Sequence, residues 1–115
     1  MKKLLIALFT VATTSIFAQS GCANPLSEEK FSAELVKVQA HDFDEAKKSA
    51  IEALFANCLT STQIKDLLSE LRFEEDKLEL AKKAHANVSD PSNFGIIKEI
   101  FDFDDSKKAI DGLMK

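Results

Sequence analysis

The chain has 115 residues, enough for one domain, with 19 acidic residues, 15 basic residues and a net charge of −4. This balance argues against binding to nucleic acids or anionic membrane surfaces, because both require a basic face. With only three glycines, the sequence also lacks a glycine-rich phosphate-binding loop.

Residues 1–18 are typical of a secretory signal peptide. Lys2 and Lys3 make the start basic, an uncharged apolar run follows, and Ala18 is a small residue before the expected cleavage point. The run is shorter than the roughly 20 apolar residues that span a bilayer, and we expect no membrane span elsewhere. Cleavage removes the two lysines and takes the net charge from −4 to −6. We therefore expect an exported protein with a flexible lead-in over residues 19–26.

The two cysteines, Cys22 and Cys58, leave several possibilities open. In an oxidising compartment they can form a disulfide that ties down the N-terminal arm. Cys58 also lies at an apolar helix position, which suits a small buried thiol. A third interpretation makes Cys22, in "QSGC", a lipid-modified N-terminus, although Gln19 stands where an aliphatic residue is usual.

Three similar stretches, "FDEAK", "FEEDK" and "FDDSK", begin 30 residues apart. A constant period of this length indicates a repeated supersecondary unit. The repeat positions are Phe43, Lys47, Phe73, Lys77, Phe103 and Lys107. We expect each ring to mark a corner between two helices, followed by acidic residues that start the next helix. We also expect Phe73 to be a core side chain whose truncation to alanine costs about 3–5 kcal/mol.

Helical patterns fill the intervals between these stretches. Thr60 and Gln63 form a capping box, and Asp90 is expected to cap a helix that has Pro91 at its first position. Apolar residues spaced at i, i+3, i+4 and i+7 predict six helices, at about 27–40, 44–57, 61–71, 74–87, 91–101 and 104–114. The fold class is therefore all-α: a single helical domain over residues 27–115, built from helical hairpin repeats as a compact bundle or a short α-solenoid.

Several of these segments, taken in order, carry a resemblance to a known family. They are the Cys58–Thr60 turn, "QIKDLL" from Gln63, "FEEDKLELAK" from Phe73, "DPSNF" from Asp90 and "FDFDDS" from Phe101. The chain resembles the domain-of-unknown-function family 4476 over about residues 28–115. The resemblance implies a helical domain at the periplasm or cell surface of a bacterium, with no assigned activity. The chain departs from the family pattern at Gly95, where a second aromatic residue is usual.

The sequence offers little for catalysis or metal binding. His41 and His85 lack a second ligand at helical spacing, and a calcium loop from Asp102 would need glycine where Lys107 stands. We expect no enzyme activity, no cofactor and no metal, and predict a protein-interaction module for an unknown protein partner. Two alternatives remain: a lipid-anchored structural protein of the envelope, or a small enzyme that uses Cys58 with a histidine.

Overall fold

The computed structural model describes residues 22–115; the predicted signal peptide and the first part of the lead-in lie outside the described residues. In chain order, the elements are α1 (Glu28–Gln39), α2 (Asp44–Leu54), α3 (Ser61–Leu68), α4 (Glu74–His85), the 3₁₀-helix η1 (Pro91–Ile100) and α5 (Asp104–Leu113). Over this range there is no extended sheet, only an isolated bridge between Leu59 and Val88. The predicted all-α class is confirmed.

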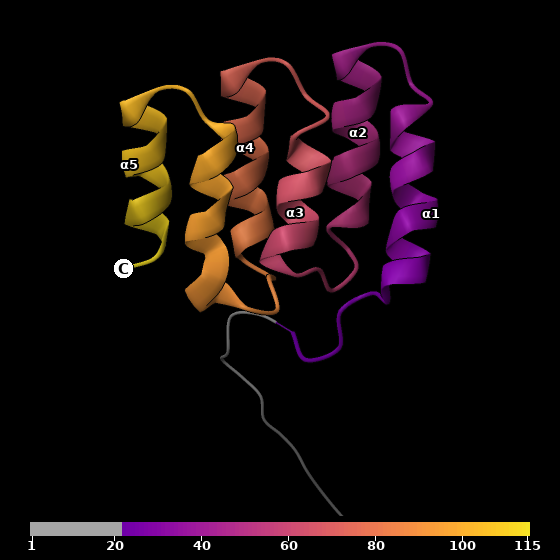
Figure 1. Cartoon of the computed structure of the whole chain (residues 1–115), viewed down its shortest axis with the longest axis horizontal. Coiled ribbons are helices and arrows are strands. Elements are labelled where there is room, and N and C mark those ends of the chain that lie inside the picture. The colour runs from indigo at the N-terminus through magenta and orange to yellow at the C-terminus, as the bar shows by residue number, and fades with distance from the viewer. Residues whose placement is uncertain (1–21) are drawn as a thin grey trace, which may run out of the picture.

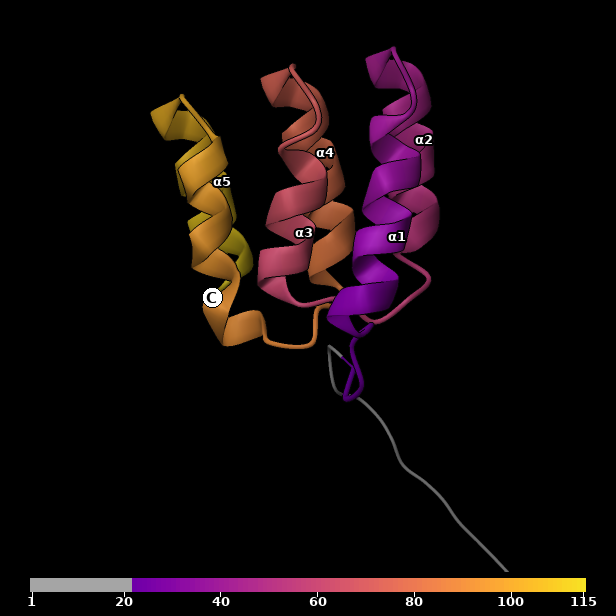
Figure 2. The same cartoon turned by 45° about the vertical axis from the view of Figure 1, so that its right-hand side comes forward.

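The helices form three pairs that lie side by side: α1 with α2, α3 with α4, and η1 with α5 (Figure 1). The first helices of the pairs form one layer and the second helices form the other, as the turned view shows (Figure 2). The second helices begin at Asp44, Glu74 and Asp104, so the 30-residue period is a structural repeat of one helix pair, here called a unit. The architecture is a short stack of helical hairpins.

Within residues 22–115, the core lies between the two layers and is made of aliphatic side chains and the buried rings of Phe31, Phe94 and Phe101, of which Phe94 is fully buried. The fully buried aliphatic residues include Ile51, Leu59, Ile64, Leu67, Leu68, Leu80, Ile97 and Ile110. They come from all three units and form one continuous cluster. Each unit is therefore stabilised mainly by packing against its neighbour.

The capping box at the start of α3 is confirmed. The Thr60 hydroxyl accepts a hydrogen bond from the Gln63 N–H at 3.0 Å, and the Thr60 N–H donates to Gln63 Oε1 at 3.0 Å. The two bonds satisfy backbone donors that a helix start leaves without partners.

The predicted positions of Asp90 at the helix cap and Pro91 at the first helical residue are confirmed, but the Asp90 side chain makes no capping bond to its own helix. Asp90 stands at the cap position of η1, but its carboxylate accepts a hydrogen bond from the Ser61 N–H in the preceding unit, at 2.7 Å. Ser61 returns a bond from its hydroxyl to the Asp90 carbonyl at 3.1 Å. The carboxylate therefore satisfies an N–H at the start of α3. The segment after Asp90 also forms a 3₁₀-helix instead of the expected α-helix.

The prediction that Phe73 is a core residue was also wrong. The exposed fractions of Phe43, Phe73 and Phe103 are 73%, 57% and 63%. Each ring sits at the cap position of a second helix, where the backbone is extended and turns around the edge of the stack. Leu71 and Phe101 already fill the interior at these turns, with exposed fractions of 2% and 3%.

Carboxylates at matching positions join each unit to the next. The first residue of α2, Asp44, accepts a hydrogen bond from the Arg72 N–H at 2.8 Å. The first residue of α4, Glu74, accepts bonds from the Asp102 and Phe103 N–H groups, both at 3.0 Å. We call this contact the inter-unit clasp; it fixes the turn of one unit against the helix start of the unit before it.

The clasp lowers the pKa of both carboxyl groups. The hydrogen bond from the Arg72 N–H lowers the pKa of Asp44 below its ordinary value of 3.8, and the Arg72 charge adds to this effect. Burial raises the pKa of Glu74, but the bonds from the Phe103 and Asp102 N–H groups outweigh it, so the pKa lies below the ordinary 4.5. Both groups therefore favour the folded state when ionised.

The third unit has a polar outer face. In the second unit, Leu68 and Ala81 are buried, as are the matching residues of the first unit. Thirty residues further on, Lys98 and Asp111 occupy these positions and form an ion pair, with Nζ 2.7 Å from Oδ1. A polar face of this kind is typical of the capping unit of a repeat stack.

We predict that two phenylalanine truncations will differ sharply in their effect on stability. Phe94→Ala removes the fully buried ring and should lower the free energy of unfolding by about 3–5 kcal/mol. Phe73→Ala removes an exposed ring and should change it by no more than about 0.5 kcal/mol. Urea unfolding followed by circular dichroism measures both, and equal losses would contradict the exposure of Phe73.

We also predict a specific acid sensitivity. Because the folded pKa values of Asp44 and Glu74 are lowered, their stabilisation is present above pH 4.5 and is lost as the pH falls through the folded values. The double variant Asp44→Asn, Glu74→Gln should be less stable at pH 7, by about 1–2 kcal/mol, and should show a shallower stability loss below pH 4.5.

The matched control neutralises the next residue of each helix, as Glu45→Gln with Glu75→Gln. These carboxylates are exposed and form no ion pair within residues 22–115, so the acid dependence should stay close to that of the unchanged protein. Denaturant titrations at a series of pH values provide the comparison. Identical pH profiles for the two double variants would refute the role of the clasp.

Candidate functional site

Three exposed rings lie along one edge of the stack, which we call the phenylalanine edge. It is formed by the turns that lead into α2, α4 and α5, along the top of Figure 1. Phe43, Phe73 and Phe103 stand at the same position in their three units, and more than half of each residue is exposed. Single exposed apolar residues are normal on a protein surface, but three rings at matching positions on one edge form a pattern.

Each ring is followed two residues later by a free carboxylate. Glu45, Glu75 and Asp105 are exposed in the first turns of α2, α4 and α5. None of the three forms an ion pair within the described chain. In the first two units, the residue between the ring and this exposed carboxylate is Asp44 or Glu74, whose side chain forms the inter-unit clasp. The edge thus repeats one ring and one free negative charge.

The charge on this edge is strongly negative. The segments 41–45, 71–75 and 101–105 contain eight carboxylates, one arginine (Arg72) and one histidine (His41), whereas the whole chain has a net charge of only −4. Arg72 is itself engaged, because its Nε lies 3.4 Å from Asp44 Oδ1 and its guanidinium carbon lies 5.8 Å from the centre of the Phe73 ring. The rings therefore lie among carboxylates. Helix starts and the inter-unit clasp account for only some of these acidic residues.

The repeated lysines belong to the scaffold beneath the rings. Lys77 donates from Nζ to the Ile100 carbonyl of the next unit at 3.1 Å, which adds to the contact between the second and third units. Lys47 and Lys107 are half-buried one turn after their rings. More than half of each ring residue stays exposed beside these lysines.

A shallow cleft of about 780 Å³ lies beside the first ring. Its lining residues are Phe43, Glu45, Ala46, Lys48, Ser49, Glu52 and Glu79. The one lysine among them is engaged, because Lys48 Nζ lies 2.7 Å from Glu79 and 3.2 Å from Asp76. Lys83 also pairs with Glu52 and Glu79, so the cleft offers an aromatic wall and the carboxylate of Glu45 to a visiting side chain.

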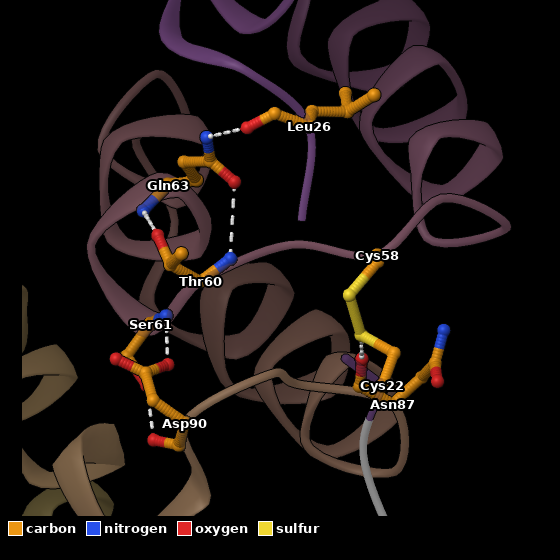
Figure 3. The surroundings of a disulfide bond; sticks show 8 residues. All are labelled: Cys22, Leu26, Cys58, Thr60, Ser61, Gln63, Asn87 and Asp90. Atoms are coloured by element: carbon orange, nitrogen blue, oxygen red, sulfur yellow. Dashed lines mark hydrogen bonds between the residues drawn. A yellow bond between two sulfur atoms is a disulfide. The ribbon is translucent and has the colours of Figure 1, made fainter. Parts of the chain in front are cut away.

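The loops at the opposite edge of the stack, along the bottom of Figure 1, include the one with Cys58 of the disulfide, whose surroundings are drawn in Figure 3. The structure joins Cys22 and Cys58, and the Leu26 N–H donates to the Cys58 carbonyl at 2.9 Å. The Leu26 carbonyl in turn accepts from Gln63 Nε2 at 3.0 Å. Residues 22–26, which the sequence assigned to a flexible lead-in, are thus fixed to the loop before α3.

The residues considered for nucleophilic catalysis are not brought together. The Cys58 sulfur is bonded to Cys22 and is not a thiolate. His41 is exposed in the turn before α2, at the other edge of the stack, while the His85 ring packs edge-to-face on Phe94 with ring centres 4.8 Å apart. Within residues 22–115, no three His, Cys, Asp or Glu side chains gather as a metal site. No helix in this range is long and apolar enough to cross a bilayer.

The exposure of the rings is the feature that the sequence reasoning missed. The signal was present, because each ring stands between two charged residues: Asp42 and Asp44 in the first unit, and Arg72 and Glu74 in the second. The apolar stripe of a helix faces the core, and these rings lie outside such a stripe.

The stack of helix pairs defines an all-α repeat protein. More particularly, the chain belongs to the family described as "Domain of unknown function (DUF4476)", which matches residues 25–114. The resemblance inferred from the sequence is confirmed. A comparison with curated proteins and a comparison with solved structures each found no match.

We predict that the disulfide contributes substantially to stability. It closes a loop between residues 36 positions apart and ties the N-terminal arm to the second unit, so Cys22→Ser with Cys58→Ser should cost about 2–4 kcal/mol. Thermal melts of the oxidised protein, the reduced protein and the double variant measure the effect. The reduced protein should melt with the variant; coincidence of all three curves would show that the bond adds nothing.

Proposed function

We propose that this protein is an exported helical repeat domain that binds a partner protein through the phenylalanine edge. The observation that carries the proposal is the exposure of Phe43, Phe73 and Phe103 at one position in three consecutive units. The fold does not need these rings in its core, which Leu71, Phe94 and Phe101 help to fill. Three exposed rings at matching positions on one edge are well placed to contact another molecule.

Aromatic side chains supply much of the affinity of protein interfaces. A buried Phe covers about 150–250 Å², and apolar burial contributes about 25 cal/mol per Å², so covering each partly exposed ring is worth roughly 2 kcal/mol. Three such rings held in place by the inter-unit clasp provide anchors without the cost of ordering a flexible loop. The adjacent cleft beside Phe43 adds a recess for one side chain.

Export of the protein is supported by two features. Residues 1–18 have the composition of a signal peptide, and the Cys22–Cys58 disulfide suits an oxidising compartment. The same bond favours a freely exported protein over a lipid-anchored one, since a thioether-linked lipid would need the Cys22 sulfur. Mass spectrometry of the mature protein should therefore find Gln19 at the N-terminus and no lipid on Cys22.

The binding proposal is tested by site-specific photo-crosslinking in the native envelope fraction. A photoreactive phenylalanine analogue replaces Phe43, Phe73 or Phe103, and the matched controls carry it at Ala56 or Ala86. The two alanines are also 30 residues apart and exposed, but they lie in the loops at the disulfide edge.

A discrete adduct is expected from the three ring positions and from neither control position. The mass of the adduct then identifies the partner. Adducts of equal yield at both edges, or adducts at the alanines alone, would contradict the proposal.

A further inference from the structure

We infer that the segment bound at the phenylalanine edge is a basic stretch of a partner protein that carries apolar side chains about 9 Å apart. The inference rests on the proposed function and adds the chemistry of the partner. Two independent properties of the edge support it: the spacing of its rings and the sign of its charge.

The spacing follows from helix packing. Phe43, Phe73 and Phe103 precede α2, α4 and α5, which lie next to one another in one layer. Packed helices have axes about 8–10 Å apart, so the rings repeat at about that distance along the edge. A polyproline II chain has three residues per turn and rises about 3.1 Å per residue, so every third side chain lies on the same face about 9 Å further along and meets the next ring.

The charge selects a basic partner. Glu45, Glu75 and Asp105 repeat with the rings, are exposed and form no ion pair within the described chain. With the further carboxylates of the three turns, they make eight acidic groups beside a single guanidinium that Asp44 already binds. A lysine- or arginine-rich segment gains charge attraction along this whole edge, while an acidic segment or an anionic lipid surface is repelled.

The cleft beside Phe43 fits the same partner. Lys83 and Lys48 already pair with Glu52 and Glu79, but Glu45 forms no ion pair within the described chain, so a long basic side chain finds an aromatic wall and one free carboxylate in the same place. A cation near the face of an aromatic ring is itself a favourable contact. A basic residue of the partner can therefore contact this cleft next to the place where an apolar residue of the partner packs on Phe43.

The experiment uses synthetic peptides as probes and the mature protein with its disulfide intact. The first peptide has leucine at every third position and lysine elsewhere. The second keeps the leucines but has glutamate in place of lysine, and the third keeps the lysines but has serine in place of leucine. Affinities are measured by fluorescence anisotropy at low and at raised salt.

Binding is expected for the lysine–leucine peptide, with weaker binding of the lysine–serine peptide and none of the glutamate–leucine peptide. Replacing all three rings, as Phe43→Ser, Phe73→Ser and Phe103→Ser, should weaken binding of the first peptide by about tenfold or more. Circular dichroism melts verify that this variant stays folded, which the exposure of the rings predicts.

The charge is tested by matched triple variants. Neutralising Glu45, Glu75 and Asp105 to their amides should weaken binding about three- to tenfold and reduce its salt dependence. Neutralising the same number of carboxylates on α1, as Glu28→Gln, Glu29→Gln and Glu34→Gln, should leave both unchanged. Equal effects of the two triples would show that only the overall charge of the protein matters, which would overturn the inference.

Two further outcomes would also overturn it. Preference for the glutamate–leucine peptide would assign the edge to an acidic partner. Ring-dependent sedimentation with phosphatidylcholine vesicles, without peptide binding, would assign it to a membrane surface. If crosslinks form at the rings while no lysine–leucine peptide binds, the interaction function stands and the basic partner is wrong; if neither occurs, both fail.

Discussion

The hydrogen bond between a helix-starting carboxylate and the backbone of the next unit is the interaction on which this structure depends. The Asp44 carboxylate accepts a hydrogen bond from the Arg72 N–H, and the Glu74 carboxylate accepts hydrogen bonds from the N–H groups of Asp102 and Phe103. Charge-assisted bonds to backbone donors are strong and directional, so they set the register between neighbouring units. Apolar packing between the layers supplies most of the stability, but it is much less directional.

The clasp also explains where the rings lie. Because it binds backbone groups next to Phe73 and Phe103, it fixes the turns at the edge of the stack and leaves their side chains outside. Adjacent acidic residues then have separate roles. In the first two units, the carboxylate directly after the ring is used inside the protein, and the following one is exposed to any partner. The scaffold and the proposed binding surface thus come from the same short motif.

Much of the fold was predictable from the sequence, because its signals are local. The 30-residue period, the starts of α2, α4 and α5, and the capping box at Thr60 each follow from residues close together in the chain. The errors arose where a residue serves a different unit. Asp90 has the sequence position of a cap for its own helix, but its carboxylate accepts a hydrogen bond from the Ser61 N–H, 29 residues away. The spacing of nearby residues does not indicate this long-range partner.

The rings show the same limit for the candidate site. Their repetition identified Phe43, Phe73 and Phe103 as important positions, but repetition alone does not distinguish a buried corner from an exposed anchor. Whether a ring is buried or exposed depends on which side chains fill the interior at the turn. Leu71 and Phe101 fill it here, and this follows from the packing of the two layers. The joining of Cys22 to Cys58 likewise depended on the arm reaching the loop before α3, through contacts between residues far apart in sequence.

Amide hydrogen exchange measured by NMR tests the clasp most directly. Asp42 and Phe43 hold the positions of Asp102 and Phe103 in the first unit, where no preceding unit within the described chain supplies a carboxylate. The N–H groups of Arg72, Asp102 and Phe103 should exchange at least about tenfold more slowly than those of Asp42 and Phe43. Equal exchange rates at these matched positions would show that the carboxylates do not hold the units together.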